Sequence, residues 1–372
     1  MNVLFDHQAY DFLNFGGIPR YFYELTKGIQ NLGCVATNTI KYSDNVFCSD
    51  QAYFDAKPFL PDYRLPGKRT IRRYLNQYSS INYLKTGDFD IVHPTYYNPY
   101  FYKYIKNKPS VVTFHDLIHE KFSSQYDFLA RDNQTVLNKQ EILKSSSTLI
   151  AVSETTKNDL IEIYDIQPER INVIGLGNSI SPQFIEKKAD VGRQQYLLYV
   201  GNRQAYKNFS FFLEAVASIL IDFDLLLVCA GGGNFNNEEQ HQIEKMSLKS
   251  HVQHQAITDT SIASLYGNAF AFVFPSLYEG FGIPVLEAFA CGCPCILSTG
   301  GSLPEIGGDA ATYFDPIDAD SLKNTIITML NDSALRQDCI AKGRKRLDVF
   351  NWDITCKQTV KLYQSILSRI TI

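Results

Sequence analysis

The stretch SLYEGFGIPVLEAFACG, residues 276 to 292, decides the fold of this chain because it joins a buried strand to a helix through a glycine-rich turn. Before it lies AFAFVFP, residues 269 to 275, an apolar run with the length and the aromatic, β-branched character of a strand that is covered on both faces. Gly282 permits the turn, and Pro284 suits the first position of a helix that begins near Ile283. The pattern predicts an α/β protein with a ligand site at the carboxyl edge of a parallel sheet.

Two carboxylates flank this turn, because Glu279 and Glu287 lie eight positions apart. The free amides and the positive dipole end at the helix start are suited to phosphate. Neither carboxylate suits a phosphate neighbour, since like charges repel, so we expect both to accept hydrogen bonds from hydroxyl groups. A ligand with a diphosphate in the middle and a polyol at each end fits this arrangement.

The segment resembles the Glu-x7-Glu motif of retaining glycosyltransferases with two Rossmann-like domains, the glycosyltransferase family 4 or glycosyl transferases group 1. The resemblance implies that Glu279 contacts hydroxyls of the donor sugar and that Glu287 contacts the ribose of the nucleotide. It also implies that the turn and helix start line the donor site, namely Gly280, Phe281, Gly282 and Ile283. The alternative is a helix start with one stabilising glutamate and an accidental second one.

Length and composition set the broad class. A chain of 372 residues exceeds one ordinary core, so two domains are expected. A net charge of −4 argues against a general nucleic-acid binder. Since the sequence has no apolar run long enough for a membrane span and no secretory signal at its start, we expect a cytoplasmic protein. A lipid-linked acceptor would bring it to the cytoplasmic face of the inner membrane as a peripheral protein.

Strand-like and helix-like segments alternate in two series, the second of which starts at YLLYVGN, residues 196 to 202. This predicts two doubly wound, Rossmann-like domains that face each other across a cleft, the GT-B arrangement of the resembled family. We expect an acceptor domain over residues 1–182, a donor domain over 183–354, and a hinge near 179–194. By resemblance, the amphipathic C-terminal segment 355–372 packs back on the first domain.

A basic loop, GNRQAYKNF at residues 201 to 209, follows the first strand of the second series. Arg203 and Lys207 are spaced to converge on one point, where two cations would stabilise a departing diphosphate. The resemblance assigns the same role to both. The alternative is a solvated basic loop.

The segment GGIPRY, residues 16 to 21, is predicted to lie between the first strand and the first helix. There Gly16 and Gly17 could present backbone amides to a phosphate or a sugar. The segment resembles the Gly-Gly loop of family members that make bacterial surface polysaccharides, including mannosyltransferase-like members. Arg20 could contact the acceptor or phosphate, or form a surface ion pair instead.

The segment TFHDLIHE, residues 113 to 120, ends a predicted strand of the first domain, which directs His115 and Asp116 toward the cleft. By resemblance, the histidine contacts the donor sugar and the aspartate lies near the acceptor. The alternatives are a satisfied core histidine for His115 and a helix cap for Asp116. We predict His115, Asp116 and Glu279 as the catalytic group.

A basic run, RLPGKRTIRRY, places five cations within ten residues: Arg64, Lys68, Arg69, Arg72 and Arg73. Such a run could bind the acceptor or dock on anionic lipid. The alternative is a solvated helix face. The run is a candidate acceptor or membrane surface, in particular through Arg69, Arg72 and Arg73.

No metal and no cofactor are expected. The Cys-x-Cys-x-Cys spacing of Cys291, Cys293 and Cys295 is more typical of small buried residues than of a metal site. Several Asp-x-Asp triplets precede strands or start a helix, and the cations of the basic loop already supply positive charge.

The resemblance implies a retaining hexosyltransferase that takes a sugar from GDP-mannose or a UDP-sugar. The expected acceptor is an oligosaccharide linked to polyprenyl diphosphate, as in O-antigen or capsule biosynthesis. The alternatives are a sugar-nucleotide epimerase on the same fold and a catalytically silent sugar-nucleotide-binding protein. Polysaccharide hydrolysis would need two carboxylates facing each other across the bond.

Overall fold

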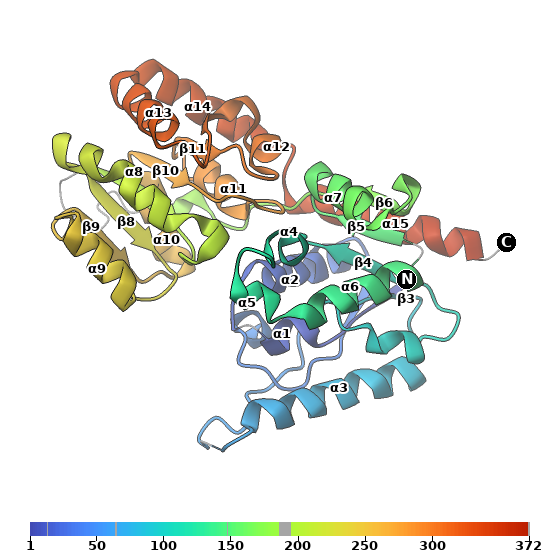
Figure 1. The fold of residues 1–372 in the computed structure, drawn as a ribbon. Helices are drawn as coiled ribbons and strands as arrows, with labels where there is room; N and C mark the ends of the chain where they lie inside the picture. Colours follow the sequence, from blue (N-terminus) through green and yellow to red (C-terminus); the bar gives the residue numbers. More distant parts are fainter. Residues whose placement is uncertain (13, 64, 147, 186–194, 371–372) are drawn as a thin grey trace. The chain divides into compact units, whose positions relative to one another are not determined.

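The computed structural model describes residues 1–372 except 13, 64, 147, 186–194 and 371–372. The chain forms two compact units, one made of Met1–Leu176 with Trp352–Ile372 and the other of Gly177–Asn351. Both units are α/β with parallel strands, as expected (Figure 1). The sequence analysis placed the domain boundary at 182/183, six residues after the boundary between the two units. Part of the expected hinge, 179–194, lies outside the described residues.

The described residues of the first unit form six parallel strands in two groups of three. The first group has the order β2 (Val35–Asn38), β1 (Asn2–Phe5), β3 (Ile91–His93), and the second has the order β4 (Val111–Phe114), β5 (Thr148–Ala151), β6 (Ile171–Val173). A single parallel bridge between Val92 and Ser110 connects the groups. The strand order reverses between β1 and β3, which makes their carboxyl ends a topological switch point.

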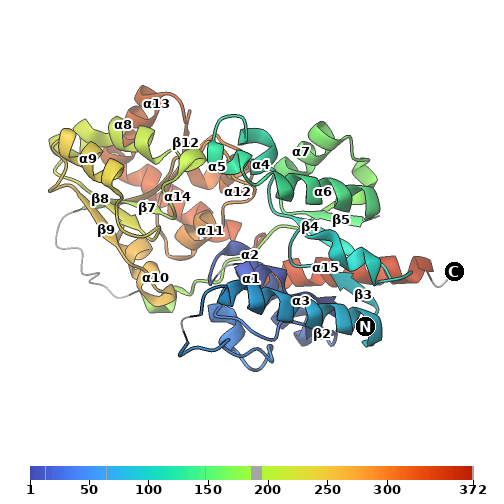
Figure 2. The same cartoon turned by 60° about the horizontal axis from the view of Figure 1, so that its bottom comes forward.

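The helices of the first unit are α1 (Gln8–Phe12), α2 (Gly17–Asn31), α3 (Lys68–Thr86), α4 (Ile118–Phe122), α5 (Asp127–Ala130), α6 (Asn133–Ser145), α7 (Glu154–Tyr164) and the C-terminal α15 (Trp352–Ile370). Helix α15 packs beside α2 of the same unit (Figure 2). A Cβ atom on Gly28 would lie 2.1 Å from Cys356 Sγ, so this glycine lets the two helices approach closely.

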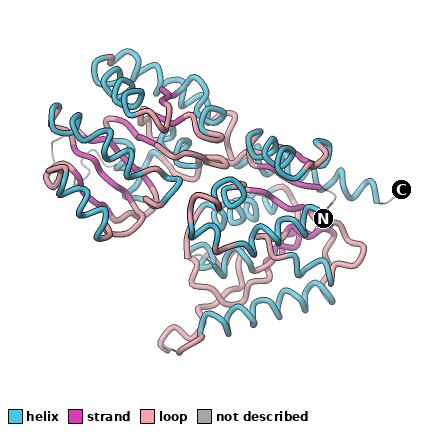
Figure 3. Tube along the Cα trace, viewed as in Figure 1, coloured by secondary structure: helices cyan, strands magenta, loops and turns pink. Residues whose placement is uncertain are grey.

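The second unit holds one parallel sheet with the strand order β12 (Ala311–Phe314), β11 (Cys295–Ser298), β10 (Ala271–Phe274), β7 (Tyr196–Val200), β8 (Leu226–Ala230), β9 (Val252–Gln255). Strands are drawn in magenta in Figure 3. This is the order of a doubly wound Rossmann sheet, whose direction reverses between β7 and β10. Its helices are α8 (Phe209–Asp222), α9 (Asn237–Lys245), α10 (Asp259–Asn268), α11 (Ile283–Ala290), α12 (Leu303–Gly307), α13 (Ala319–Asn331) and α14 (Ser333–Arg346).

Local sequence signals set several helix starts. Helix α11 begins at Ile283, as predicted, after Gly282 with φ 98°, although Pro284 occupies the second helical position and not the first. Helix α13 begins after Asp318, whose carboxylate accepts hydrogen bonds from the amides of Asp320 and Ser321. One prediction was wrong, because α1 intervenes between β1 and the GGIPRY segment, so the glycine pair opens the second helix.

Within the described residues, no helix combines the length and the apolarity needed to cross a lipid bilayer.

Candidate active site

The loops after β7 and β10 lie together at the switch point of the second unit. The amide of Leu277 donates a hydrogen bond of 2.7 Å to the carbonyl oxygen of Tyr206, which ties one loop to the other. Both loops leave the carboxyl ends of neighbouring parallel strands, where ligands of doubly wound sheets bind. The basic loop and the Glu-x7-Glu segment therefore occupy one site.

Lys207 and Glu279 form an ion pair at the centre of this site. Lys207 Nζ lies 2.7 Å from Glu279 Oε1, and both side chains are mostly buried. The ammonium group also lies over the rings of Tyr206 and Phe274, at 5.1 and 5.5 Å from their centroids. A charged pair held at the edge of a sheet in this way can exchange partners with an entering anion and its hydroxyl groups.

The backbone of Glu279 is fixed by the turn after β11, which the sequence analysis did not single out. The carbonyl oxygen of Glu279 accepts hydrogen bonds from Ser302 N at 3.0 Å and Ser302 Oγ at 3.1 Å. Gly301 has φ +59°, and a Cβ atom on it would lie 2.4 Å from the same oxygen. The sequence signal was the GGS triplet at residues 300–302, directly after a buried strand.

Glu287 lies on α11, where its carboxylate is oriented from the neighbouring α10. Tyr266 donates a hydrogen bond of 3.2 Å to Glu287 Oε2. Burial, and then the charge of Glu287, raise the pKa of Tyr266 well above its usual range, so the tyrosine is a permanent donor. Glu287 itself is half-buried, which leaves part of the residue open at the site.

The turn between the two glutamates has mainly a packing role in this structure. Phe281 is buried, with its ring edge-on to Phe350 at 5.7 Å. A Cβ atom on Gly282 would lie 2.9 Å from Leu303 Cδ2, so glycine is required by both backbone and space. Gly280 is buried and Ile283 is half-buried. That these four residues line a donor site remains a prediction.

Arg203 and Lys207 do not share a partner, in contrast to the predicted convergence. The guanidinium of Arg203 donates to the carbonyl oxygens of Gly231, Gly233 and Asn234 at 3.1, 2.8 and 3.0 Å. Its Nε lies 3.0 Å from Glu239 Oε1, and the side chain is almost fully buried. Arg203 therefore holds the glycine-rich loop after β8, and Lys207 is the cation that faces the Glu-x7-Glu segment.

In the first unit, the glycine pair opens α2 as its N-cap and first residue. Gly16 has φ 142°, and its carbonyl oxygen accepts the amide of Arg20 at 3.1 Å. Gly17 is exposed, and the Arg20 guanidinium lies over the ring of Phe47 at 5.5 Å. Roles of these residues in binding a phosphate, sugar or acceptor remain predictions.

His115 is the first residue after β4, at the strand end where the sequence placed it. Its ring packs edge-on against Tyr21 of α2 at 5.2 Å, which brings the GGIPRY segment beside it. Nε2 is buried and has no hydrogen-bond partner among the residues that the structure describes. Burial lowers the pKa of His115 to about 4, so the ring is neutral at pH 7. An unsatisfied buried nitrogen favours a ligand hydroxyl over a satisfied core histidine.

The Asp116 carboxylate closes a local turn before α4, and a buried lysine that the sequence did not reveal contacts its backbone. Asp116 Oδ1 accepts a hydrogen bond of 3.2 Å from the amide of Ile118. Lys139 Nζ donates to the Asp116 carbonyl oxygen at 3.0 Å and to Glu120 Oε2 at 3.1 Å, and Tyr164 completes the network through Glu120 Oε1 at 2.7 Å. Lys139 lies on a mostly polar stretch of α6, which gave no sequence signal for burial.

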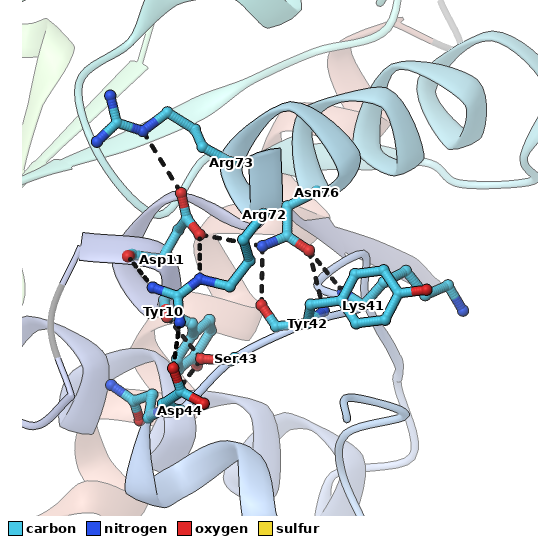
Figure 4. Close-up of polar contacts among 10 residues, drawn as sticks. Tyr10, Asp11, Lys41, Tyr42, Ser43, Asp44, Arg72, Arg73 and Asn76 are labelled. Carbon is cyan, nitrogen blue, oxygen red and sulfur yellow. Dashed lines mark hydrogen bonds and ion pairs between the residues drawn. The ribbon is translucent and has the colours of Figure 1, made fainter. Parts of the chain in front are cut away.

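The basic run of α3 is only partly exposed, and for Arg72 the predicted contact with acceptor or membrane was wrong. Arg72 is buried, where its guanidinium pairs with Asp44 and with Asp11 at 3.3 Å (Figure 4). Arg73 is 56% exposed, with its Nε 3.6 Å from Asp11 Oδ2. Arg69 is exposed, and Arg64 lies outside the described residues.

The three alternating cysteines at the end of α11 and the start of β11 are buried free thiols, in agreement with their interpretation as small core residues. Burial raises the pKa of Cys291 to about 12 and that of Cys295 well above its usual range. Among the residues that the structure describes, no three His, Cys, Asp or Glu side chains are grouped to hold a metal ion.

Comparison with known proteins identifies the family. Glycosyl transferases group 1 matches residues 181–346, and Glycosyltransferase Family 4 matches residues 15–179. O-antigen chain mannosyltransferase B of Escherichia coli is 28% identical over 285 residues, which are 72% of this chain and 74% of that one. O-antigen chain mannosyltransferase RfbU of Salmonella typhimurium strain LT2 is 30% identical over 60% of this chain and 62% of its own length.

The fold is also that of solved glycosyltransferases. WaaG, described as a glycosyltransferase involved in lipopolysaccharide biosynthesis, superposes with a TM-score of 0.74 at 19% identity, over 98% of this chain and 99% of that one. At this identity the likeness concerns the fold alone, but the two family matches cover both units. The chain therefore belongs to the group 1, family 4 glycosyltransferases, and it is a hexosyltransferase with the two-domain GT-B fold.

Proposed function

We propose that the chain is a retaining glycosyltransferase that transfers a hexosyl group from a nucleotide diphosphate sugar to a lipid-linked oligosaccharide of a bacterial surface polysaccharide. Two relatives bear the name O-antigen chain mannosyltransferase, which makes GDP-mannose the first donor to test and UDP-sugars the second. An acceptor on polyprenyl diphosphate would place the enzyme at the cytoplasmic face of the inner membrane.

The observation that carries this proposal is the Lys207–Glu279 ion pair at the switch point of the second unit. The donor diphosphate would draw the ammonium of Lys207 to its oxygens, where positive charge stabilises the departing nucleoside diphosphate. Glu279 would then accept hydrogen bonds from hydroxyls of the donor sugar. The free amides at the start of α11 follow directly after the same turn and would add partial positive charge near the diphosphate.

Glu287 would hold the nucleotide from the opposite end, by accepting hydrogen bonds from the ribose hydroxyls. The Tyr266 hydroxyl, which already donates to one of its oxygens, fixes the orientation of the carboxylate. We assign Arg203 a positioning role, because its donors are engaged by the glycine-rich loop and Glu239. Neither role requires a metal ion.

In this mechanism the protein supplies no nucleophile. The incoming acceptor hydroxyl attacks the anomeric carbon from the face that the diphosphate leaves, and the leaving diphosphate oxygen takes its proton, so the anomeric configuration is retained. His115 would contribute a neutral ring that exchanges a hydrogen bond with a donor hydroxyl, since its pKa of about 4 keeps it uncharged at pH 7.

Donor binding is tested by thermal shift of the full chain with GDP-mannose, UDP-glucose, dTDP-glucose and ADP-glucose, with and without EDTA. We expect a shift with one nucleotide class that EDTA leaves unchanged and that is lost in Glu287→Ala and in Lys207→Ala. Glu238→Ala and Lys249→Ala, at exposed positions of the same unit, are matched controls that keep the shift. The absence of a shift with every donor would contradict the proposed donor site.

Turnover is tested separately with a synthetic polyprenyl-diphosphate oligosaccharide. We expect release of the nucleoside diphosphate together with a product heavier by one hexose, whose anomeric configuration by NMR equals that of the donor. Donor binding without product would favour a catalytically silent sugar-nucleotide-binding protein. A changed sugar nucleotide in the absence of acceptor would favour an epimerase.

A further inference from the structure

Helix α3 reverses the usual distribution of polar and apolar side chains. Its buried positions recur every four residues and are mostly polar, namely Arg72, Asn76, Ser80 and Leu84. An ordinary surface helix buries an apolar stripe and exposes its charged residues. Here the residues that meet the body of the first unit are the ones that would normally face water.

The polar inner face is fully engaged. Asn76 Nδ2 donates to Asp11 Oδ1 at 3.1 Å and to the Tyr42 carbonyl oxygen at 2.8 Å, and its own oxygen accepts the amide of Tyr42 at 2.9 Å (Figure 4). Ser80 Oγ lies 2.7 Å from His7 Nδ1 and 2.6 Å from Thr39 Oγ1.

The contacts of Arg72 fix which face of α3 is buried. Its Nε lies 3.3 Å from Asp11 Oδ1, and its guanidinium also reaches the Asp11 carbonyl oxygen at 3.1 Å. Rotating the helix to bury its apolar side would leave the buried carboxylate of Asp11 without these partners, which is costly. The outward direction of the apolar side chains is therefore fixed by the fold.

These outward side chains form a continuous stripe. Ile71, Tyr74, Leu75 and Tyr78 have the spacing i, i+3, i+4, i+7 of one helix face, and they are 47, 68, 39 and 72% exposed. We call these four residues the outer stripe. The preceding loop adds exposed Leu60, Tyr63 and Leu65. In the described part of the chain, exposed large apolar side chains are otherwise scattered.

The charge of helix α3 is positive, and the preceding loop adds one exposed carboxylate, Asp62. Helix α3 contains five Lys or Arg and no Asp or Glu, although the whole chain carries a net charge of −4. Arg69, Arg73 and Lys85 are exposed, whereas Lys68 Nζ donates to the carbonyl oxygens of Leu60 and Tyr63 and so pins the apolar loop beside the helix. Asp44, which is partly exposed nearby, is paired with Arg72.

We propose that the outer stripe of α3 and its exposed cations form a docking surface for an anionic lipid bilayer. Tyrosine, leucine and isoleucine side chains enter the boundary between headgroups and acyl chains, while Arg and Lys extend to the headgroup phosphates. A second copy of the chain fits less well, because a symmetric contact would bring the cations of α3 against each other, and α3 carries no carboxylate to pair with them.

This surface goes beyond the transfer reaction and does not depend on the donor site. Its residues belong to the first unit, and the Lys207–Glu279 pair belongs to the second. Failure of bilayer binding therefore leaves the proposed donor chemistry standing, and failure of donor binding leaves the docking surface standing.

The test is flotation of the full chain with vesicles of phosphatidylcholine alone and of phosphatidylcholine with an equal amount of phosphatidylglycerol. We expect binding to the anionic vesicles, and its loss in Tyr74→Ser/Tyr78→Ser. Arg69→Gln/Arg73→Gln should weaken binding by at least about tenfold, since each cation contributes roughly 1 kcal/mol near an anionic surface. Salt at about 1 M should weaken binding as well, because it shortens the Debye length to about 3 Å.

Matched variants separate this surface from general stickiness. Leu137→Ser/Ile163→Ser removes two exposed apolar side chains from α6 and α7, and Lys357→Gln/Lys361→Gln removes two exposed cations from α15. Both double variants should bind as the unchanged chain does, and circular dichroism should show that every variant is folded.

Three results would overturn the proposal. The first is the absence of flotation with anionic vesicles, and the second is an equal loss of binding in the matched variants. The third is a concentration-dependent dimer, seen by analytical ultracentrifugation, that Tyr74→Ser/Tyr78→Ser abolishes while vesicle binding is absent. That last result would assign the outer stripe to a second copy of the chain.

Discussion

The side chains that lie where the strand order reverses differ between the two units. In the second unit, the reversal between β7 and β10 holds the Lys207–Glu279 ion pair, two charged groups with one another as partner. In the first unit, the reversal between β1 and β3 holds Asp6, which is buried and satisfied by Thr95, Gln8 and Tyr100. The same topology therefore gives a candidate binding site in one unit and a structural junction in the other.

The difference shows that a topological switch point does not by itself make a ligand site. The side chains there must also have groups that can bind a ligand. Asp6 accepts from the Thr95 amide at 2.8 Å, from Gln8 Nε2 at 2.6 Å and from the Tyr100 hydroxyl at 3.1 Å. No capacity is left for a sugar or a phosphate. The candidate ligand group of the first unit lies at the end of β4 instead, where His115 Nε2 is buried and has no hydrogen-bond partner within the described part of the chain.

The largest expected effect is on catalysis at the reversal of the second unit. Lys207→Ala and Glu279→Ala should each lower kcat/KM by on the order of 10²- to 10³-fold, the range for loss of one electrostatic contact to a reacting group. Thermal stability should also fall in both variants, because each leaves a mostly buried charge without its partner, so activity is compared at a temperature where circular dichroism shows every variant folded. Glu238→Ala is the control and should keep full activity. If the activity of Lys207→Ala stayed within a few-fold of that of the unchanged chain, the reversal in the second unit would not be a binding site.

The next largest effect concerns the reversal of the first unit. Asp6→Ala should lower the free energy of unfolding of that unit by roughly 3 kcal/mol, because several buried donors lose their acceptor. Hydrogen exchange at the amides of β1 and β3 measures it, and donor binding by the second unit should be unchanged. Asp88→Ala, at an exposed position beside the same sheet, is the control. If Asp6→Ala were as stable as Asp88→Ala, the junction would not be structural.

Arg203→Lys sharpens the contrast within a single loop. A lysine has no planar fork with which to bind Glu239 and the carbonyl oxygens of the glycine-rich loop, so the free energy of unfolding of that loop should fall by about 2 kcal/mol. Exchange of the Gly231 amide, which donates to the Gln255 carbonyl oxygen at 3.0 Å, reports this loss. Lys207→Ala should leave that amide protected, and equal exchange in both variants would show that the two cations do not have separate roles.

The smallest effect is a pH dependence from His115. Burial lowers its pKa from the usual 6.5 to about 4. The charge of Asp116 opposes this shift, and the charge of Lys139 adds to it. The unfolded chain thus binds more protons between these values, so stability is present above about pH 6.5 and is lost as the pH falls toward 4. His115→Gln should reduce the slope of Tm against pH in this window. A slope unchanged by the substitution would show that the ring titrates normally.

Much of the candidate site could be predicted because its signals are local. The apolar run at 269–275, the glycines after it and Pro284 act within a few residues of one another, and β10, the turn and α11 appear where these signals lie. Lys139 and the GGS turn were missed for the opposite reason. Their roles depend on Glu120 and Glu279, which are 19 and 23 residues away in the chain.

The sequence by itself determined the α/β class, the two series of strands and the placement of Glu279, Glu287 and His115 at or beyond strand ends, since periodicity and turn chemistry act over short distances. Only the tertiary structure decided which carboxylate pairs with Arg203 and which with Lys207. Arg203 pairs with Glu239, 36 residues away, and Lys207 pairs with Glu279, 72 residues away. The order of strands in the sheet brings those segments together, and no local pattern encodes it. The same holds for α3, whose inner face was chosen by the buried Asp11 of another helix.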